Sequence, residues 1–213
     1  MSKVPEVVDS INMPYHHGNL RETLVDVGLE LARQDGPDAV VLRAVSRAAG
    51  VSHNAAYRHF ADRDDLLFAV CGRCMARLAA LMRERIGELR PVPDRQQAAW
   101  DVLRAAGQAY VEFALDEPGW FRTAFGVPRD MAMHHSAPEG AADDPYRILI
   151  SALDGLVDSG AMDPARRPGA EYAAWAAVHG ISTLLIDGPL RDLPAGERRV
   201  AVEAVLGAIE AGL

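Results

Sequence analysis

Hydrophobic residues recur three and four positions apart along most of the chain, the spacing that places side chains on one face of an α-helix. No stretch sustains the alternation of hydrophobic and polar residues, rich in β-branched side chains, that predicts a strand. We therefore expect an all-α fold. The predicted helices cover residues 19–34, 42–49, 53–59, 62–89, 94–115, 119–125, 144–159, 169–186 and 195–211.

The residues at the ends of two of these helices predict how each begins and stops. Asn19 can cap the first helix, and Glu22 follows three residues later, as in a capping box. Asp62 can cap the long helix while Asp65 reaches back, and Pro91 ends that helix because proline cannot continue it. The buried stripe expected on the first helix consists of Leu20, Leu24, Val27 and Leu31.

The most informative stretch is residues 42–60, where two short helices are predicted around Gly50. Glycine can adopt the left-handed conformation that ends one helix and lets the chain turn sharply. Ser52 can cap the next helix by accepting from a free backbone N–H group, which leaves Ala56 and Phe60 facing inward. The first helix of the pair has three apolar residues on one side, Leu42, Val45 and Ala49. This pattern predicts a helix-turn-helix.

The second helix of a helix-turn-helix enters the major groove of DNA with its N-terminal end first. The residues expected to face base edges are therefore Ser52, His53, Asn54 and Ala55. Asn54 is the sharpest candidate, because an Asn side chain can form two hydrogen bonds with adenine. Tyr57, Arg58 and His59 lie where their side chains can reach toward phosphates.

Three short motifs resemble the DNA-binding domain of the TetR family of bacterial repressors, namely Gly50-Val51-Ser52, Tyr57-Arg58-His59-Phe60 and Asp62-Arg63-Asp64-Asp65-Leu66. The resemblance implies that Tyr57, His59 and Arg63 hold DNA phosphates. Val41 stands where the family often has a Thr that touches phosphate, so no contact is carried over to that position. Ser46 replaces an Ala that is common where the two helices cross, which is a small change in volume.

The overall charge is unusual for a protein that binds DNA, since the formal net charge is −8 and the pI is about 5.3. The charge is distributed unevenly, however. Between residues 42 and 63 the cations are Arg43, Arg47, Arg58 and Arg63, and the one acid is Asp62. Charges more than about 10 Å apart are largely screened at cellular salt, so the locally basic patch decides contact with phosphates.

The predicted helix 169–186 carries a strip of mostly small side chains at spacings of four, three and four. Such a strip lets another helix approach closely, so we expect a four-helix seam with a second copy of the chain. The residues expected at this interface are Ala173, Ala177, Gly180 and Leu184, together with Ala201, Val205, Leu206 and Ile209 on the last helix. The alternative is that the two helices pack only within one subunit. The motif Trp175-x-x-x-His179-Gly180 resembles the C-terminal ligand-binding domain of one branch of the TetR family.

Most large aromatic side chains lie in the second half of the chain, which indicates either a ligand pocket or an ordinary core. Small-molecule pockets are mostly apolar with a few placed polar groups. The candidate pocket residues are Trp100, Tyr110, Phe113, Trp120, Phe121, Phe125, Trp175 and His179. Each of them, taken singly, also fits close packing of the core, and His179 fits a hydrogen-bonded interior histidine.

Cys71 and Cys74 lie one helical turn apart, a spacing that suits a metal or a redox pair, with His134 and His135 as further possible ligands. No second Cys pair and no βαβ pattern accompany them, so inert packing is the favoured interpretation and no cofactor or metal is expected. The nucleophile elbow, the phosphate-binding glycine loop and the H-E-x-x-H motif are all missing from the sequence, which argues against an enzyme. No apolar run is long enough to span a membrane and no secretion signal is visible, so a cytoplasmic location is expected.

Four segments are expected: a flexible arm (1–18), a helix-turn-helix DNA-binding domain (19–61), a long connecting helix (62–90), and a ligand-binding and dimerisation domain (91–213). The predicted function is that of a homodimeric transcriptional repressor, released from a double-stranded DNA operator by a small-molecule effector. Two alternatives remain at this point: a helical protein-interaction module that does not bind DNA, and a small helical enzyme that uses the aromatic cavity.

Overall fold

The computed structural model describes residues 20–126 and 144–213, and within these ranges every regular element is helical. The expected arm (1–18) and the irregular segment expected at 129–143 lie outside the described residues. The α-helices are α1 (Leu20–Asp35), α2 (Leu42–Ala48), α3 (His53–Tyr57), α4 (Arg63–Gly87), α5 (Arg95–Asp116), α6 (Pro118–Phe125), α8 (Pro145–Ser159), α9 (Ala170–Ile186) and α10 (Ala195–Gly212), and two short 3₁₀ helices cover Pro37–Ala39 and Pro164–Arg166. The all-α prediction is confirmed.

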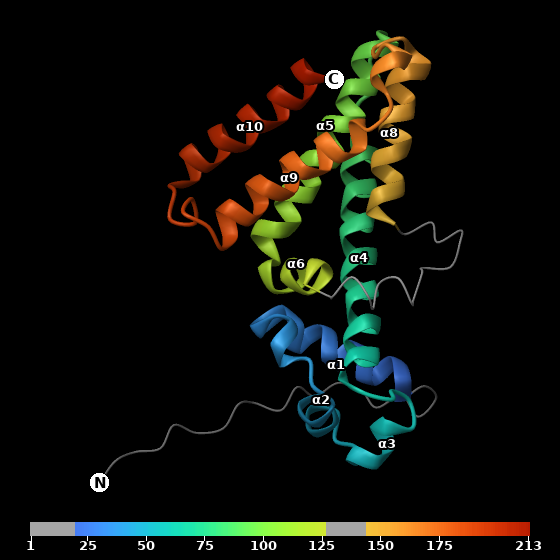
Figure 1. The fold of residues 1–213 in the computed structure, drawn as a ribbon, viewed down its shortest axis with the longest axis vertical. Helices are drawn as coiled ribbons and strands as arrows, with labels where there is room; N and C mark the ends of the chain where they lie inside the picture. The colour runs from blue at the N-terminus through green and yellow to red at the C-terminus, as the bar shows by residue number, and fades with distance from the viewer. Residues whose placement is uncertain (1–19, 127–143) are drawn as a thin grey trace.

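The helices form two tiers, as Figure 1 shows. Helices α1 to α3 make a small unit at one end, and α5, α6, α8, α9 and α10 make a larger bundle at the other. Helix α4 runs through both tiers and packs against α1 in the first and against α5, α6 and α8 in the second. Helix α4 is therefore one continuous helix that connects the two tiers.

The buried face of α1 differs from the predicted stripe. Leu24 is buried as expected, but Leu20, Val27 and Leu31 are only half-buried. The buried positions of the helix are Leu24, Val25, Gly28, Leu29 and Ala32. A Cβ added at Gly28 would lie 2.8 Å from Val70 Cγ2 on α4, so the two helices touch at Gly28 and the face of α1 turns toward α4.

The turn between α2 and α3 follows the prediction. Gly50 has φ = 68°, the left-handed conformation that a residue with a Cβ rarely adopts. Ser52 caps α3, its Oγ accepting from the backbone N–H of Ala55 at 3.2 Å. Helix α3 ends at Tyr57, two residues earlier than predicted. On α2 the buried Ser46 hydroxyl donates to the Leu42 carbonyl at 2.6 Å, so the extra polar group at the helix crossing is satisfied within its own helix.

The predicted cap of α4 is present, whereas Asn19, the expected cap of the first helix, lies outside the described residues. The Asp62 carboxylate accepts from the Asp65 N–H at 2.9 Å, and Asp65 Oδ2 in turn accepts from the Ala61 N–H at 3.1 Å. Asp94 and Asp144 cap α5 and α8 in the same way. The helices of the larger bundle, which we call the upper tier, begin and end within two residues of their expected bounds. None of the described helices is long and apolar enough to span a membrane.

Candidate DNA-binding surface and effector cavity

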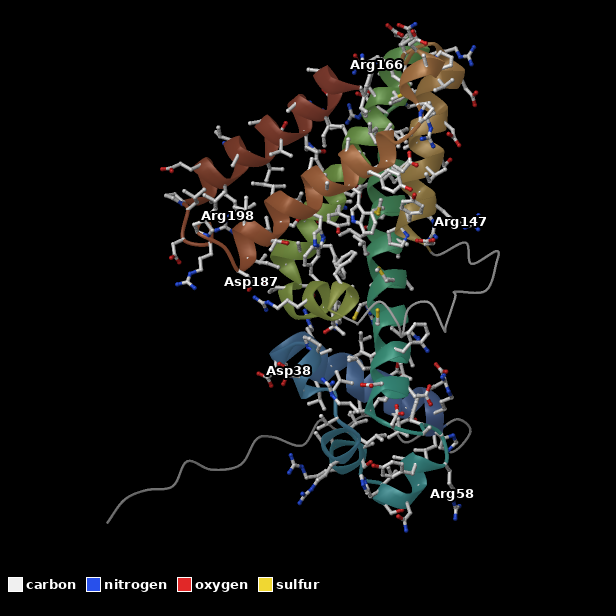
Figure 2. All side chains as sticks on the ribbon, in the orientation of Figure 1. Asp38, Arg58, Arg147, Arg166, Asp187 and Arg198 are labelled. Atoms are coloured by element: carbon white, nitrogen blue, oxygen red, sulfur yellow. The ribbon has the colours of Figure 1, made fainter. Side chains whose placement is uncertain are left out.

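Helix α3 presents its polar residues at the extreme end of the molecule. Ser52, His53 and Asn54 are exposed and Ala55 is half-buried. Ala56 and Phe60, which anchor the helix, are both 0 % exposed. Figure 2 shows Arg58 projecting from this end, away from the upper tier. The N-terminal turn of α3 is therefore free to meet a large partner.

The surroundings of α3 are basic and aromatic. The rings of His53 and Tyr57 meet edge to face with centroids 4.6 Å apart, and Tyr57 is 48 % exposed. Arg58 and His59 are exposed beside them, and Arg43 and Arg47 are exposed on α2. Exposed guanidinium groups with phenol and imidazole groups near them can donate hydrogen bonds to phosphate oxygens. The structure thus gathers the predicted side chains on one surface.

Arg63 differs from the other predicted phosphate contacts. Its Nε donates to the Val40 carbonyl at 3.2 Å, and its terminal nitrogen donates to the Pro37 carbonyl at 2.9 Å. A carboxylate oxygen of Asp38 lies 3.6 Å from the same guanidinium group. Arg63 therefore fastens the segment between α1 and α2 to the start of α4, a role that the sequence pattern did not reveal.

The two tiers meet where α6 lies on the end of α1. A Cβ added at Gly119 would overlap the carbonyl oxygens of Ala32 and Arg33, so only glycine allows this approach. The Trp120 Nε1–H donates to the Leu29 carbonyl at 2.8 Å. Arg33 also forms a two-pronged ion pair with Glu117, at 2.7 Å for each nitrogen–oxygen contact. Helix α6 is thus held directly to the unit of α1 to α3.

Trp120 belongs to this junction and not to a ligand pocket. The guanidinium carbons of Arg33 and Arg77 lie 5.2 Å and 4.7 Å from its ring centroid, within cation–π range. Phe113 stacks on Trp120 with a centroid separation of 6.4 Å. The pocket assignment of Phe113 and Trp120 was therefore wrong, because both rings are used to pack the tiers together.

A cavity of about 110 Å³ lies inside the upper tier, between α4, α5, α6, α8, α9 and α10. Three of the predicted pocket residues line it, namely Tyr110, Phe125 and Trp175. The sequence analysis assigned none of the other lining residues to a pocket, and these are Met75, Met82, Leu103, Arg104, Ala106, Gly107, Asp144, Pro145, Tyr146, Leu149, Ala174, Val178, Leu206, Ile209 and Glu210. Trp100 does not line the cavity and packs against a separate apolar cluster that contains Leu153 and Leu156.

Phe121 and His179 form a second layer behind the cavity wall. Tyr110 Oη accepts from the Trp175 Nε1–H at 3.2 Å and lies 2.9 Å from His179 Nδ1. Burial lowers the pKa of His179 and raises the pKa of Tyr110, so both groups are neutral near pH 7. The Tyr110 hydroxyl then donates to His179 Nδ1. His179 and Phe121, whose ring stacks on it at 5.4 Å, support the wall without lining it.

A shallow groove follows α9 and α10 on the outside of the upper tier. It is lined by six of the predicted interface residues, Ala173, Ala177, Gly180, Leu184, Val205 and Ile209. Leu184 is 41 % exposed although it is apolar. Leu206 is 4 % exposed and faces the cavity, because α10 turns this side chain toward Gly107 of α5, so its placement on the outer face was wrong. Ala201 is half-buried against the core.

Cys74 is buried and Cys71 is half-buried, and the pKa of each thiol is raised, which lowers its reactivity. Cys74 is 0 % exposed, and the Cys71 thiol donates to the Ala124 carbonyl at 3.3 Å. Burial raises the pKa of Cys71 to about 11 and that of Cys74 further. Within residues 20–126 and 144–213, no three His, Cys, Asp or Glu side chains are grouped so that they could hold a metal ion. His134 and His135 lie outside the described residues.

An exposed recognition helix on a small three-helix unit, joined by one long helix to a larger helical bundle, defines a helix-turn-helix regulator. Residues 24–70 match the family model for bacterial regulatory proteins of the tetR family, and residues 103–209 match the model for the tetracyclin repressor-like C-terminal domain. The chain belongs to the TetR family of transcriptional regulators, whose members regulate transcription and are not enzymes.

Individual relatives agree with this assignment. The solved structure of a protein of unknown function from Rhodococcus sp. RHA1 is 30% identical, with a TM-score of 0.66 over 95% of this chain and 99% of that chain. A putative tetR family regulator from Shewanella sp. PV-4 shares the fold at 16% identity, with a TM-score of 0.57 over 88% of this chain and 96% of that one. The uncharacterized HTH-type transcriptional regulator YobS of Bacillus subtilis is 23% identical over 172 residues, 79% of this chain and 80% of that protein.

Proposed function

We propose that the protein is a homodimeric repressor that binds a near-palindromic DNA operator and is released from it by a small molecule. The observation that carries the proposal is the exposed N-terminal turn of α3, which presents His53 and Asn54 to the outside. Ala56 and Phe60 are buried and anchor the helix in the core. Asn54 would read adenine, and Tyr57, Arg58 and His59 would bind phosphates. Acting on the chromosome, the protein would work in the bacterial cytoplasm.

The groove on α9 and α10 supports the homodimer. Its small side chains leave room for a helix, and no atom of the described residues, apart from the backbone of α9 itself, lies within 4 Å of a Cβ built at Gly180. A two-fold axis through this surface would pair α9 and α10 with their copies as a four-helix seam. It would also place the two α3 helices about 34–36 Å apart, which is the separation of successive major grooves.

The positions of α4 and α6 support a coupling between the cavity and the DNA-binding surface. Phe125 at one end of α6 lines the cavity, and Gly119 and Trp120 at the other end hold α1. Met75 and Met82 of α4 also line the cavity. An effector that binds one arrangement of these helices better than another would change the separation of the recognition helices. About 3 kcal/mol of coupling lowers DNA affinity roughly 150-fold.

The proposed functional units follow the expected bounds of 19–61, 62–90 and 91–213, with one refinement. Val70, near the start of α4, lies against Gly28 of α1, and Leu66 and Leu67 beside it are buried. The first turns of α4 therefore belong physically to the DNA-binding unit, and the later turns belong to the effector domain. This sharing is what allows α4 to act as a connector.

The proposed function is tested by selecting bound duplexes from a random pool with the purified full chain, then repeating the selection with a metabolite mixture. We expect enrichment of a near-palindromic sequence in the first selection and its loss in the second. Absence of salt-sensitive binding to any duplex would support an interaction protein that does not bind DNA. Enrichment that persists with every metabolite would contradict release by an effector.

The dimer is tested with Gly180→Arg, because the new side chain meets open space in the subunit and would clash only with a second copy. Gly155→Arg on α8 is the matched control, since Gly155 too is half-buried and no atom from another described part of the chain lies within 4 Å of its Cβ position. Sedimentation should show a dimer for the wild type and the control. For Gly180→Arg the dimer dissociation constant should rise by about 100-fold or more, equivalent to roughly 2.7 kcal/mol. An unchanged dimer would place the interface elsewhere.

A further inference from the structure

The wall of the cavity is made almost entirely of hydrocarbon. Met75, Met82, Leu103, Leu149, Val178 and Leu206 contribute much of it. Its volume of about 110 Å³ is comparable with the engineered apolar cavity of about 150 Å³ that stays dry and binds benzene. A ligand that fits without large rearrangement is therefore about the size of one aromatic ring or a short alkyl chain.

Arg104 is the one cation among the described lining residues, and its charge is already neutralised. Its Nε and one terminal nitrogen bind both carboxylate oxygens of Glu210 at 2.7 and 2.8 Å. Its other terminal nitrogen binds Glu203 at 2.6 Å. One positive charge thus faces two negative ones, and an anionic ligand would have to displace a carboxylate to gain a partner.

The other carboxylate of the lining, Asp144, is a poor partner for a cationic ligand. Its Oδ1 accepts from the Tyr146 N–H at 2.9 Å and caps α8. A carboxylate with this role favours the helix start that forms the cavity wall. An ammonium group would lose its hydration on entry and would gain in return only a carboxylate that is already hydrogen-bonded.

Two neutral polar side chains of the wall, Trp175 and Tyr110, also have partners. The Trp175 N–H donates to Tyr110 Oη, and the Tyr110 hydroxyl bonds to His179 Nδ1. An apolar ligand therefore leaves no buried donor of this pair unsatisfied, and a polar ligand would compete with bonds that already exist.

We infer that the effector of this cavity is a neutral, predominantly hydrocarbon molecule, and that the Arg104–Glu203–Glu210 cluster excludes carboxylates. This inference rests on the proposed function only in treating the cavity as the effector site. The exclusion is a property of paired charges, so it can be reversed by substitution.

Three probes of matched size test the ligand class by calorimetric titration of the full chain: ethylbenzene (neutral), phenylacetate (anionic) and phenethylammonium (cationic). We expect ethylbenzene to bind at least about tenfold more tightly than either charged probe, a difference of roughly 1.4 kcal/mol. Equal or tighter binding of a charged probe would overturn the inference, and so would failure of all three to bind.

The double variant Glu203→Gln, Glu210→Gln tests the role of the charge cluster, because it frees Arg104 without a large change of shape. Its affinity for phenylacetate should rise about tenfold, and its affinity for ethylbenzene should stay within about twofold of the wild type. Glu197→Gln, an exposed position on the same helix, is the control and should change neither. A rise that fails to appear in a folded double variant would contradict the exclusion.

Arg104→Gln is the second variant, informative even if the double variant does not fold. Ethylbenzene binding should be retained, because Arg104 neutralises no charge on the ligand. Loss of binding confined to this variant would mean that Arg104 recognises the effector. Release of the selected operator duplex separates the two proposals. If ethylbenzene binds but does not release DNA, the proposed function is contradicted and the inferred ligand class stands. If phenylacetate alone releases DNA, the proposed function stands and the inferred ligand class is contradicted.

Discussion

The surface around α3, which we call the recognition end, and the cavity of the upper tier differ in the polarity and exposure of their side chains. Around α3 the functional side chains are polar, exposed and within eight residues of one another, from Ser52 to His59. The cavity is lined mostly by apolar side chains drawn from α4, α5, α6, α8, α9 and α10, and its polar side chains Arg104, Tyr110 and Trp175 already have hydrogen-bond partners. A surface that binds DNA needs unpaired hydrogen-bond donors. Binding of an apolar ligand in a small cavity is instead favoured when no donor in the cavity wall is left unpaired.

The difference also determines how each region responds to substitution. At the recognition end, a side chain can be removed with little loss of packing, so binding and stability can be measured separately. In the upper tier, the residues that shape the cavity are also core residues, so most changes alter both. Gly119 and Trp120 lie where the two regions meet, and substitutions there should affect both at once.

The largest effect is expected at the junction, for Gly119→Val. The new side chain would overlap the carbonyl oxygens of Ala32 and Arg33, which are backbone atoms that cannot move aside cheaply. We expect the free energy of unfolding to fall by about 3 kcal/mol or more in urea denaturation. Gly72→Val should change stability little, because none of residues 20–126 and 144–213 outside the backbone of α4 has an atom within 4 Å of its Cβ position. A loss below about 1 kcal/mol would show that the tiers do not rely on this contact.

The next effect compares two arginines of the recognition end, Arg63→Ala and Arg58→Ala. Arg63 donates to the Val40 and Pro37 carbonyls, so its loss should lower the free energy of unfolding by about 1.5 kcal/mol. Arg58 is exposed at the tip, so its loss should leave stability unchanged. It should weaken binding to all duplexes alike and reduce the slope of log affinity against log salt by about 0.9. Equal stability of the two variants would refute the structural role of Arg63.

A smaller effect is expected for Ser52→Ala, which removes the cap of a helix of only five residues. The cost should be about 1 kcal/mol of stability, accompanied by weaker binding to every operator because α3 frays at its N-terminal turn. Urea denaturation and operator titration measure the two parts. Ser151→Ala, on the exposed face of α8, is the control and should affect neither.

The smallest effect is a pH dependence from His179. Burial holds the pKa of His179 below its usual value of 6.5, so the unfolded chain takes up this proton more readily than the folded one. The contribution of His179 to stability is therefore complete above about pH 6.5 and is lost as the pH falls below it toward the lowered pKa. Urea denaturation between pH 7.5 and 5 should show a shallower decline for His179→Gln than for the wild type. An identical decline would mean that His179 does not titrate differently in the two states.

The recognition end was predictable from the sequence because its determinants are local. A glycine with a positive φ, a serine cap and two inward residues, Ala56 and Phe60, all fall within eleven positions, and each leaves a readable signal. The exceptions come from contacts with distant residues. The face of α1 was misjudged because Gly28 meets Val70 of α4. The bonds from Arg63 to the Pro37 and Val40 carbonyls were missed because those residues lie far from it in sequence, and its phosphate contact stays a prediction.

The cavity was only partly predictable, for the same physical reason. A large aromatic residue on a helix gives the same sequence pattern whether it lines a cavity, as Phe125 does, or packs two tiers together, as Trp120 does. The residues that set its electrostatics, Arg104 and Glu210, are more than a hundred positions apart and resemble ordinary surface charges in the sequence. Only the packing of α5 against α10 brings them together.

The central claim is that the exposed turn of α3 reads bases, and Asn54→Ala tests it most directly. Affinities of the wild type and the variant should be measured for the selected operator and for each of its single-base-pair substitutions. We expect discrimination at one symmetry-related pair of positions to fall by 1–3 kcal/mol, roughly 5- to 150-fold, with discrimination elsewhere unchanged. A uniform loss of affinity across all duplexes would contradict base reading by Asn54.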